Sequence, residues 1–125
     1  MMLQKIQNAL ININETVFQD LGDCYFYAKS GICGTINRRG SQVGKQKTKK
    51  GTPDTSILLP NGKYILIEYS TNITKGVTKL LSDVSNCLDY SKTGILLNDI
   101  EKIIICFNFN LKSSEESLWQ MLFVI

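Results

Sequence analysis

The stretch GTPDTSILLPNGKYILIEYS, residues 51–70, decides the fold, because it reads as a β-hairpin with one acidic residue near each end. The two apolar runs of the hairpin are joined by the turn sequence PNG at 60–62. Proline favours the first central position of a type I turn, and the glycine after it supplies the left-handed residue of a G1 bulge. We therefore expect a three-residue loop that pairs Leu59 with Lys63.

This register places Asp54 directly across from Glu68, with their Cβ atoms about 4.5–5.5 Å apart. A two-residue turn would instead set Asp54 opposite Tyr69 and send the two carboxylates to different faces of the sheet. In the expected register one face also carries Ser56, Leu66 and Ser70, and the other face carries Thr55, Ile57, Ile65, Ile67 and Tyr69. The hairpin thus predicts a pair of carboxylates on one face.

The carboxylate pair has two interpretations. Two neighbouring carboxylates repel each other, more strongly when they are partly buried, where one of them takes up a proton. A divalent cation removes this conflict, and Mg²⁺ prefers one or two carboxylates together with water and phosphate oxygens. In the other interpretation, Asp54 and Glu68 are surface charges at strand ends that nearby lysines neutralise. The spacing alone leaves both interpretations open.

The composition, with 43% hydrophobic and 20% charged residues in a chain of 125, is that of one folded domain spanning residues 1–125. No apolar run approaches the roughly 20 residues that span a bilayer, and the N-terminus lacks the features of a secretory signal. We therefore expect a cytoplasmic protein with no membrane partner.

Histidine is absent, which excludes a Ser-His-Asp or Cys-His catalytic arrangement and any histidine general base. The cysteines form no CxxC pair, so we expect reduced and mostly buried thiols and no zinc site. They are Cys24, Cys33, Cys87 and Cys106. Chemistry in this chain must therefore depend on carboxylates and lysines, with or without a metal ion.

Apolar periodicity and turn residues predict the order helix, strand, strand, strand, helix, strand, helix, which is an α/β fold with helices packed on a small mixed sheet. Asn14 is expected to cap the first main helix, which stops at Ser30, after a shorter helix or turn at 3–10. Thr74 is expected to cap the second helix and Ser113 the last. The expected strands are 32–37, 55–59, 64–71 and 103–107. The last strand, IIICF, is typical of a strand covered on both faces.

Pro53-Asp54, followed by Glu68-Tyr69-Ser70 within this order of elements, resembles the motif of the PD-(D/E)xK nuclease superfamily, the restriction-endonuclease-like fold with an αβββαβ core. The resemblance covers roughly residues 14–109. More narrowly, the sequences KTKKGTPDT and NGKYILIEYST, and a following helix that ends in CLDYSKTG, resemble N-terminal nuclease-type domains of NACHT and related STAND-type NTPases in prokaryotic antiphage defence.

The resemblance implies that Asp54 and Glu68 bind one or two Mg²⁺ or Mn²⁺ ions that serve the hydrolysis of a phosphodiester. It also implies a further acidic or amide ligand from the first helix, for which Gln19 is our candidate, with Glu15 and Asp20 behind it.

Ser70 departs from the family pattern, because the motif has a lysine there and a serine hydroxyl supplies no positive charge. Either another lysine takes over, with Lys79 or Lys75 of the second helix or Lys50 of the preceding loop as candidates, or the site is impaired.

The loop between residues 38 and 51 is strongly basic and contains no acidic residue. Basic side chains beside a nuclease cleft neutralise DNA phosphates in a sequence-independent and salt-sensitive way. We therefore expect this loop to bind DNA, the alternative being a loop that only aids solubility. Its basic residues are Arg38, Arg39, Lys45, Lys47, Lys49 and Lys50.

The sequence thus predicts a Mg²⁺-dependent DNA endonuclease domain that serves as an effector in antiphage defence. Its last residues, 118–125, are almost wholly apolar, so they either pack on this domain or face a second copy or a larger NTPase or sensor chain. Two alternatives stay open. One is a catalytically inactive DNA-binding or assembly module with the same fold, and the other is an interaction domain that docks a partner through 118–125.

Overall fold

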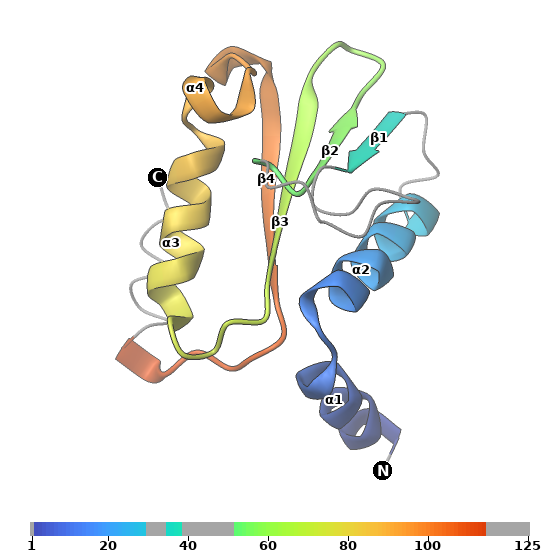
Figure 1. Ribbon diagram of the computed structural model, residues 1–125. Helices are drawn as coiled ribbons and strands as arrows, with labels where there is room; N and C mark the ends of the chain where they lie inside the picture. Colours follow the sequence, from blue (N-terminus) through green and yellow to red (C-terminus); the bar gives the residue numbers. More distant parts are fainter. Residues whose placement is uncertain (1, 30–34, 39–51, 115–125) are drawn as a thin grey trace.

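The computed structural model describes residues 2–29, 35–38 and 52–114. Its centre is a four-stranded sheet with the strand order β1-β2-β3-β4 (Figure 1). Neighbouring strands are antiparallel from β1 to β3, and β4 is parallel to β3. The strands are β1 (Thr35–Arg38), β2 (Thr55–Leu58), β3 (Tyr64–Ser70) and β4 (Ile100–Phe107). The expected fold class, a mixed sheet flanked by helices, is confirmed.

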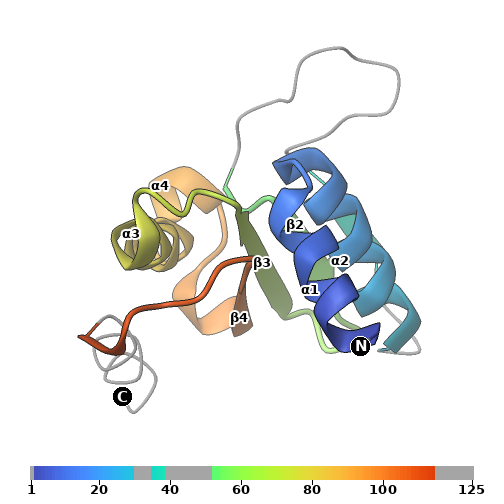
Figure 2. The ribbon, with the colours of Figure 1, turned by 90° about the horizontal axis from the view of Figure 1, so that it is seen from below.

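Helices cover both faces of this sheet. Figure 2 shows α1 and α2 on one side of β3 and α3 and α4 on the other. A helical crossover between β3 and β4 is what a parallel pair of strands requires. The helices are α1 (Met2–Asn12), α2 (Glu15–Lys29), α3 (Gly76–Cys87) and α4 (Tyr90–Thr93), and a 3₁₀ turn, η1 (Leu97–Asp99), precedes β4. The helix expected from Ser113 lies mostly outside the described residues.

The hairpin has the register that the turn sequence predicts. The N–H of Leu59 donates to the carbonyl of Lys63 at 2.8 Å, and the N–H of Gly62 donates to the carbonyl of Leu59 at 3.0 Å. Gly62 has φ of 83°, the left-handed conformation of a G1 bulge. The pairs continue to Thr55 opposite Ile67. One more step along the hairpin brings Asp54 level with Glu68.

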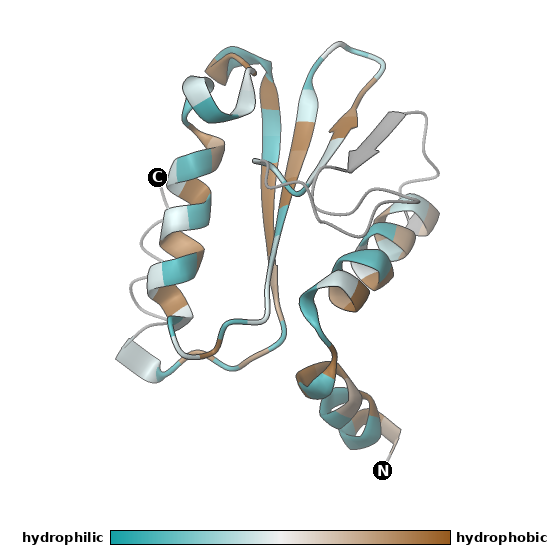
Figure 3. Cartoon of the chain, in the orientation of Figure 1, coloured by the Kyte–Doolittle hydropathy of each residue, from teal (hydrophilic) through white to brown (hydrophobic). Residues whose placement is uncertain are grey.

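The two faces of the hairpin enter two separate cores. On the α2 side, Phe18 packs with Ile57, Ile67 and Tyr69 in a buried cluster, and the rings of Phe18 and Tyr69 meet edge to face with centroids 5.6 Å apart. On the α3 side, the buried residues include Leu66 of the hairpin and Val77, Leu80 and Cys87 of the helix. Figure 3 shows hydrophobic bands that alternate with hydrophilic ones along α3.

The two helix starts differ in how well the sequence predicts them. Asn14 caps α2 as expected, because its Oδ1 accepts a hydrogen bond from the N–H of Val17 at 2.9 Å. Thr74 does not cap α3, so that expectation is wrong. Instead, Asn72 accepts the N–H of Lys75 through Oδ1 and the N–H of Gly76 through its carbonyl, both at 3.1 Å. Gly76 has φ of 51°, so the chain enters α3 through a tight turn held by Asn72 and not through an extended cap residue.

The strand IIICF was expected to be buried on both faces, and this is wrong. Within the described sheet, β4 is the last strand in the order, and residues 103–107 are half-buried. The cysteines with described positions are free thiols, with Cys87 buried, Cys106 half-buried and Cys24 exposed. Cys33 lies outside the described residues.

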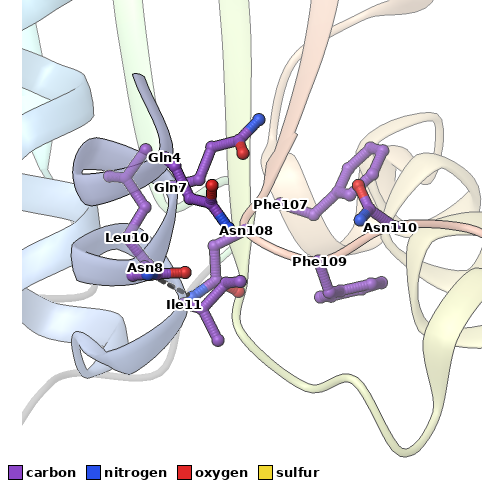
Figure 4. A pocket seen from close by; sticks show the side chains of 9 residues that line it. All are labelled: Gln4, Gln7, Asn8, Leu10, Ile11, Phe107, Asn108, Phe109 and Asn110. Atoms are coloured by element: carbon purple, nitrogen blue, oxygen red, sulfur yellow. Dashed lines mark hydrogen bonds between the residues drawn. The ribbon is translucent and has the colours of Figure 1, made fainter. Parts of the chain in front are cut away.

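Helix α1 has no buried residue, and its large apolar side chains are exposed except for the half-buried Leu10. The Nδ2 of Asn108, just after β4, donates to the carbonyl of Leu10 at 2.7 Å and ties the helix to the sheet (Figure 4). Among the described residues, no helix is both long enough and apolar enough to cross a bilayer.

Candidate metal and active site

Asp54 and Glu68 lie together where β2 begins and β3 nears its end. The backbone N–H of Asp54 donates to Oε1 of Glu68 at 3.2 Å, and the backbone N–H of Tyr69 donates to Oδ2 of Asp54 at 2.9 Å. Each carboxylate therefore binds the backbone of the other strand. Glu68 is 6% exposed, which does not fit a solvated surface charge. The structure thus brings together the two acids that the register predicts.

Electrostatic strain is concentrated on this pair. Burial raises the pKa of Glu68 to about 9, and the charges of Asp54 and Asp83 add to the rise, while Lys79 opposes it. Burial also raises the pKa of Asp54 to about 6, against the effect of the Tyr69 N–H, which lowers it. Without a cation, Glu68 therefore holds a proton near neutral pH. A divalent ion bound in place of that proton would relieve the same repulsion.

Gln19 reaches the site through the main chain. It is 4% exposed, and its Nε2 donates to the carbonyl of Asp54 at 3.1 Å and to Oγ1 of Thr55 at 3.3 Å. These bonds fix the segment that carries the Asp54 carboxylate. Glu15 and Asp20 are both exposed on α2, and the charge of Glu15 is close enough to raise the pKa of Asp54.

Asp23 is a site residue that the sequence did not reveal. Asp23 is 7% exposed. Its Oδ1 accepts hydrogen bonds from the hydroxyl of Thr55 at 2.8 Å and from the hydroxyl of Tyr69 at 2.7 Å. A methyl group at Gly22 would overlap the Tyr69 ring, so glycine allows this close approach. Asp23 thus ties α2 to the two strands that carry the acids. Its spacing of four residues from Gln19, on one helix face, was the available signal.

Ser70, at the lysine position of the motif, and Lys79, a candidate to replace that lysine, lie on β3 and α3. Ser70 is 1% exposed, and its Oγ accepts the N–H of Asn72 at 3.2 Å, so it shapes the turn into α3. Lys79 projects from α3, and its charge lowers the pKa of Glu68. Burial lowers the pKa of Lys79, but its bond to Asp83 and the charges of nearby acids, Glu68 among them, raise it by more. Lys75 is exposed at the start of α3, and Lys50 lies outside the described residues.

Asp83 is the second buried acid that the sequence did not reveal. It is 3% exposed and forms an ion pair with Lys79 through Oδ1. Burial raises its pKa, against the effect of Lys79. The thiol of Cys87, one turn further on, donates to Oε1 of Glu68 at 3.9 Å. The signal for Asp83 was its place on the apolar stripe of α3, between Leu80 and Cys87.

No three Cys, Asp or Glu side chains of the described residues lie close enough together to hold a metal ion. A cation at Asp54 and Glu68 would therefore complete its shell with water and substrate oxygens, which suits Mg²⁺. The basic segment begins beside this site, because Arg38 of β1 pairs with Thr55. Arg39, Lys45, Lys47, Lys49 and Lys50, and the apolar residues 118–125, lie outside the described residues.

A separate pocket of about 250 Å³ lies between α1 and the end of β4 (Figure 4). None of the described residues that line it is ionisable. The side chains of Gln4, Gln7 and Asn108 gather between the helix and the strand end. The pocket therefore offers no acid–base group, and the acidic site remains the candidate for chemistry.

Comparisons of the chain with protein-family models, with curated proteins and with solved structures gave no match. The resemblance to PD-(D/E)xK nucleases therefore stays a prediction from the motif.

Proposed function

We propose that this chain is a metal-dependent DNA endonuclease domain that hydrolyses phosphodiester bonds at Asp54 and Glu68. The observation that supports this most is the geometry of the pair, in which Glu68 accepts the backbone N–H of Asp54 and Asp54 accepts the backbone N–H of Tyr69. Burial and mutual repulsion disfavour the charged forms of both carboxylates, and a bound Mg²⁺ or Mn²⁺ would stabilise them.

In this proposal Asp54 and Glu68 hold the cation, which supplies Lewis-acid activation of water and stabilises negative charge on phosphoryl oxygens. Gln19 and Asp23 fix the backbone around Asp54, so the carboxylate keeps its direction. Lys79 offsets charge beside Glu68, in the role that the motif gives to a lysine. Ser70 contributes the turn that brings α3, and with it Lys79, towards the strands.

The proposed substrate is DNA, because the basic segment 38–50 starts on the strand next to the site. Lysine and arginine side chains there would bind phosphates without reading sequence. We also propose, from the sequence resemblance, that the domain is an effector in antiphage defence. It would act as a homo-oligomer or as part of a larger NTPase or sensor chain.

The test is nicking of supercoiled plasmid with Mg²⁺ or Mn²⁺, with EDTA as the metal control. Asp54→Asn and Glu68→Gln are expected to lower the rate by about 100-fold or more, since even residues that only support metal ligands contribute about 10–100-fold. Glu101→Gln, which changes an exposed acid on β4, is the matched control and is expected to cleave normally. Cleavage that survives both site variants would overturn the proposal.

A second candidate, an inactive DNA-binding module, is favoured by Ser70 at the lysine position of the motif. It predicts that the folded wild-type protein binds DNA but cleaves it in no metal. Binding would then depend on salt and be lost in the double variant Lys47→Glu with Lys49→Glu, while Asp54→Asn would leave it unchanged.

A further inference from the structure

The ion pair of Lys79 and Asp83 lies on the border between the buried acids and the outer surface of α3. The side chain of Lys79 is 30% exposed and that of Asp83 is 5% exposed. Oδ1 of Asp83 binds Lys79, whereas Oδ2 is buried and has no hydrogen-bond partner among the described residues. An acid that is buried with one oxygen unsatisfied lowers the stability of the fold.

Two features show that this pair contributes little to the helix itself. An apolar residue between Leu80 and Cys87 would continue the buried stripe of α3, and well-packed apolar residues in place of a buried ion pair are often neutral or stabilising. The order of the charges is also the less favourable one, because in an isolated helix an acid four residues before a lysine stabilises more than the reverse. The pair therefore needs another explanation.

The position of Lys79 supplies that explanation. On its outer side, α3 has an open groove lined by Thr74, Lys75, Thr78, Lys79 and Ser82. A lysine side chain that is free to rotate would gain entropy and hydration by extending into this groove. The bond to the buried carboxylate of Asp83 instead holds the ammonium group towards the buried face of α3, the face from which the thiol of Cys87 contacts Glu68. The charge of Lys79 lowers the pKa of Glu68 accordingly.

We propose that Asp83 is a positioning residue that fixes the ammonium group of Lys79 beside the carboxylate pair. A lysine on α3 thereby supplies the positive charge that Ser70 on β3 lacks. This inference rests on the proposed nuclease function for its catalytic consequence, whereas the placement of Lys79 is a property of the free protein.

The placement is tested by NMR on protein labelled with ¹⁵N-lysine. An ammonium group held by a buried carboxylate exchanges its protons slowly enough to give an H–N correlation, and the exposed lysines do not. We expect one such signal from Lys79, identified by its loss in Lys79→Met. It is expected to vanish in Asp83→Asn and to persist in the conservative variant Asp83→Glu. A Lys79 signal that is absent from the wild type, or unchanged in Asp83→Asn, would overturn the proposal.

The catalytic consequence is tested by a double-mutant cycle. Asp83→Asn and Lys79→Met are each expected to lower kcat by about 10–100-fold, with KM little changed. The double variant is expected to be no slower than Lys79→Met, because Asp83 acts through Lys79. If the double variant instead loses kcat by the product of the two single losses, the proposal is overturned.

Melting curves identify any variant that fails to fold, and Asp83→Leu, which fills the apolar stripe without a charge, then replaces Asp83→Asn. If the folded wild type cleaves nothing, the nuclease assignment fails while the NMR result still decides the placement.

Discussion

Glu68 is the residue on which the electrostatics of the site depend. Its carboxyl is buried beside Asp54, and a second acid, Asp83, adds negative charge from α3. Lys79, in the described part of the chain, is the cation whose charge opposes this rise in the pKa of Glu68. Three carboxyls and one ammonium group therefore share this part of the described structure, and the balance between them depends on pH and on any bound cation.

The metal-free protein is expected to lose stability as pH rises. Between the ordinary Glu68 pKa of 4.5 and its folded value of about 9, the folded state keeps a proton that the unfolded chain has lost. The free energy of unfolding therefore falls with pH, by up to about 1.4 kcal/mol per pH unit for one proton. Urea unfolding with EDTA at pH 5.5 and pH 8.5 measures this. Glu68→Gln is expected to reduce the slope, and an equal slope in that variant would contradict the assignment.

Lys79→Met is expected to destabilise the protein by about 1–3 kcal/mol, because it leaves the buried Asp83 without its charged partner. Adding Asp83→Asn should recover part of this loss, since the unpaired charge is then gone. Lys102→Met, which changes an exposed lysine on β4, should stay within about 0.5 kcal/mol of the wild type. Urea unfolding of these variants provides the check, and equal losses at Lys79 and Lys102 would show that the pair has no such energetic role.

At the scale of elements, α2 holds the hairpin by side-chain hydrogen bonds as well as by apolar packing. Asp23 accepts hydrogen bonds from the hydroxyls of Thr55 on β2 and Tyr69 on β3. The backbone N–H of Tyr69 also donates a hydrogen bond to Asp54, so Tyr69 links α2 to the acidic site. The helix thus limits how far the two strands can separate at the carboxylates.

Tyr69→Phe is expected to lower the free energy of unfolding by about 1–3 kcal/mol, because the buried carboxylate of Asp23 loses a donor. The variant keeps the ring that packs on Phe18, so the measured loss comes from the hydroxyl and not from the apolar packing. Tyr64→Phe changes a half-buried tyrosine on the same strand and is the matched control. A loss at Tyr69 no larger than at Tyr64 would count against this role of Asp23.

The sequence predicts the local features of these elements well. The hairpin register follows from the turn at 60–62, and the Asn14 cap follows from residues within one helical turn. The half-burial of β4 depends on strand order, which the residues of β4 do not encode. Asp23 and Tyr69 are 46 residues apart, so their bond is not visible in any local pattern. Asp83 is not singled out by the local pattern, because Val77, Leu80, Val84 and Cys87 complete the apolar stripe of α3 without it.

At the scale of the whole molecule, the pairing of Arg38 with Thr55 brings the start of the basic segment next to the residue that follows Asp54. In the proposed function, the basic side chains of this segment would bind the phosphate backbone while Asp54 and Glu68 hold the metal ion. The residues of this segment beyond Arg38 lie outside the described residues.

The double variant Lys47→Glu with Lys49→Glu is expected to weaken DNA binding strongly. If each lysine neutralises one phosphate, the slope of log K against log salt becomes shallower by about 1.8, because each contact contributes about 0.9. Fluorescence anisotropy with a labelled duplex at several salt concentrations measures the slope. A double variant with the same slope as the wild type would exclude these lysines as phosphate contacts.

The measurement that tests the central claim most directly is a Mn²⁺ titration at neutral pH, followed by EPR of the free ion. We expect the wild type to bind Mn²⁺, Asp54→Asn and Glu68→Gln to lose that binding, and Glu101→Gln to retain it. Undiminished binding in Glu68→Gln, or a wild type that takes up no Mn²⁺ either alone or with DNA, would contradict the assignment of Asp54 and Glu68 as a metal site.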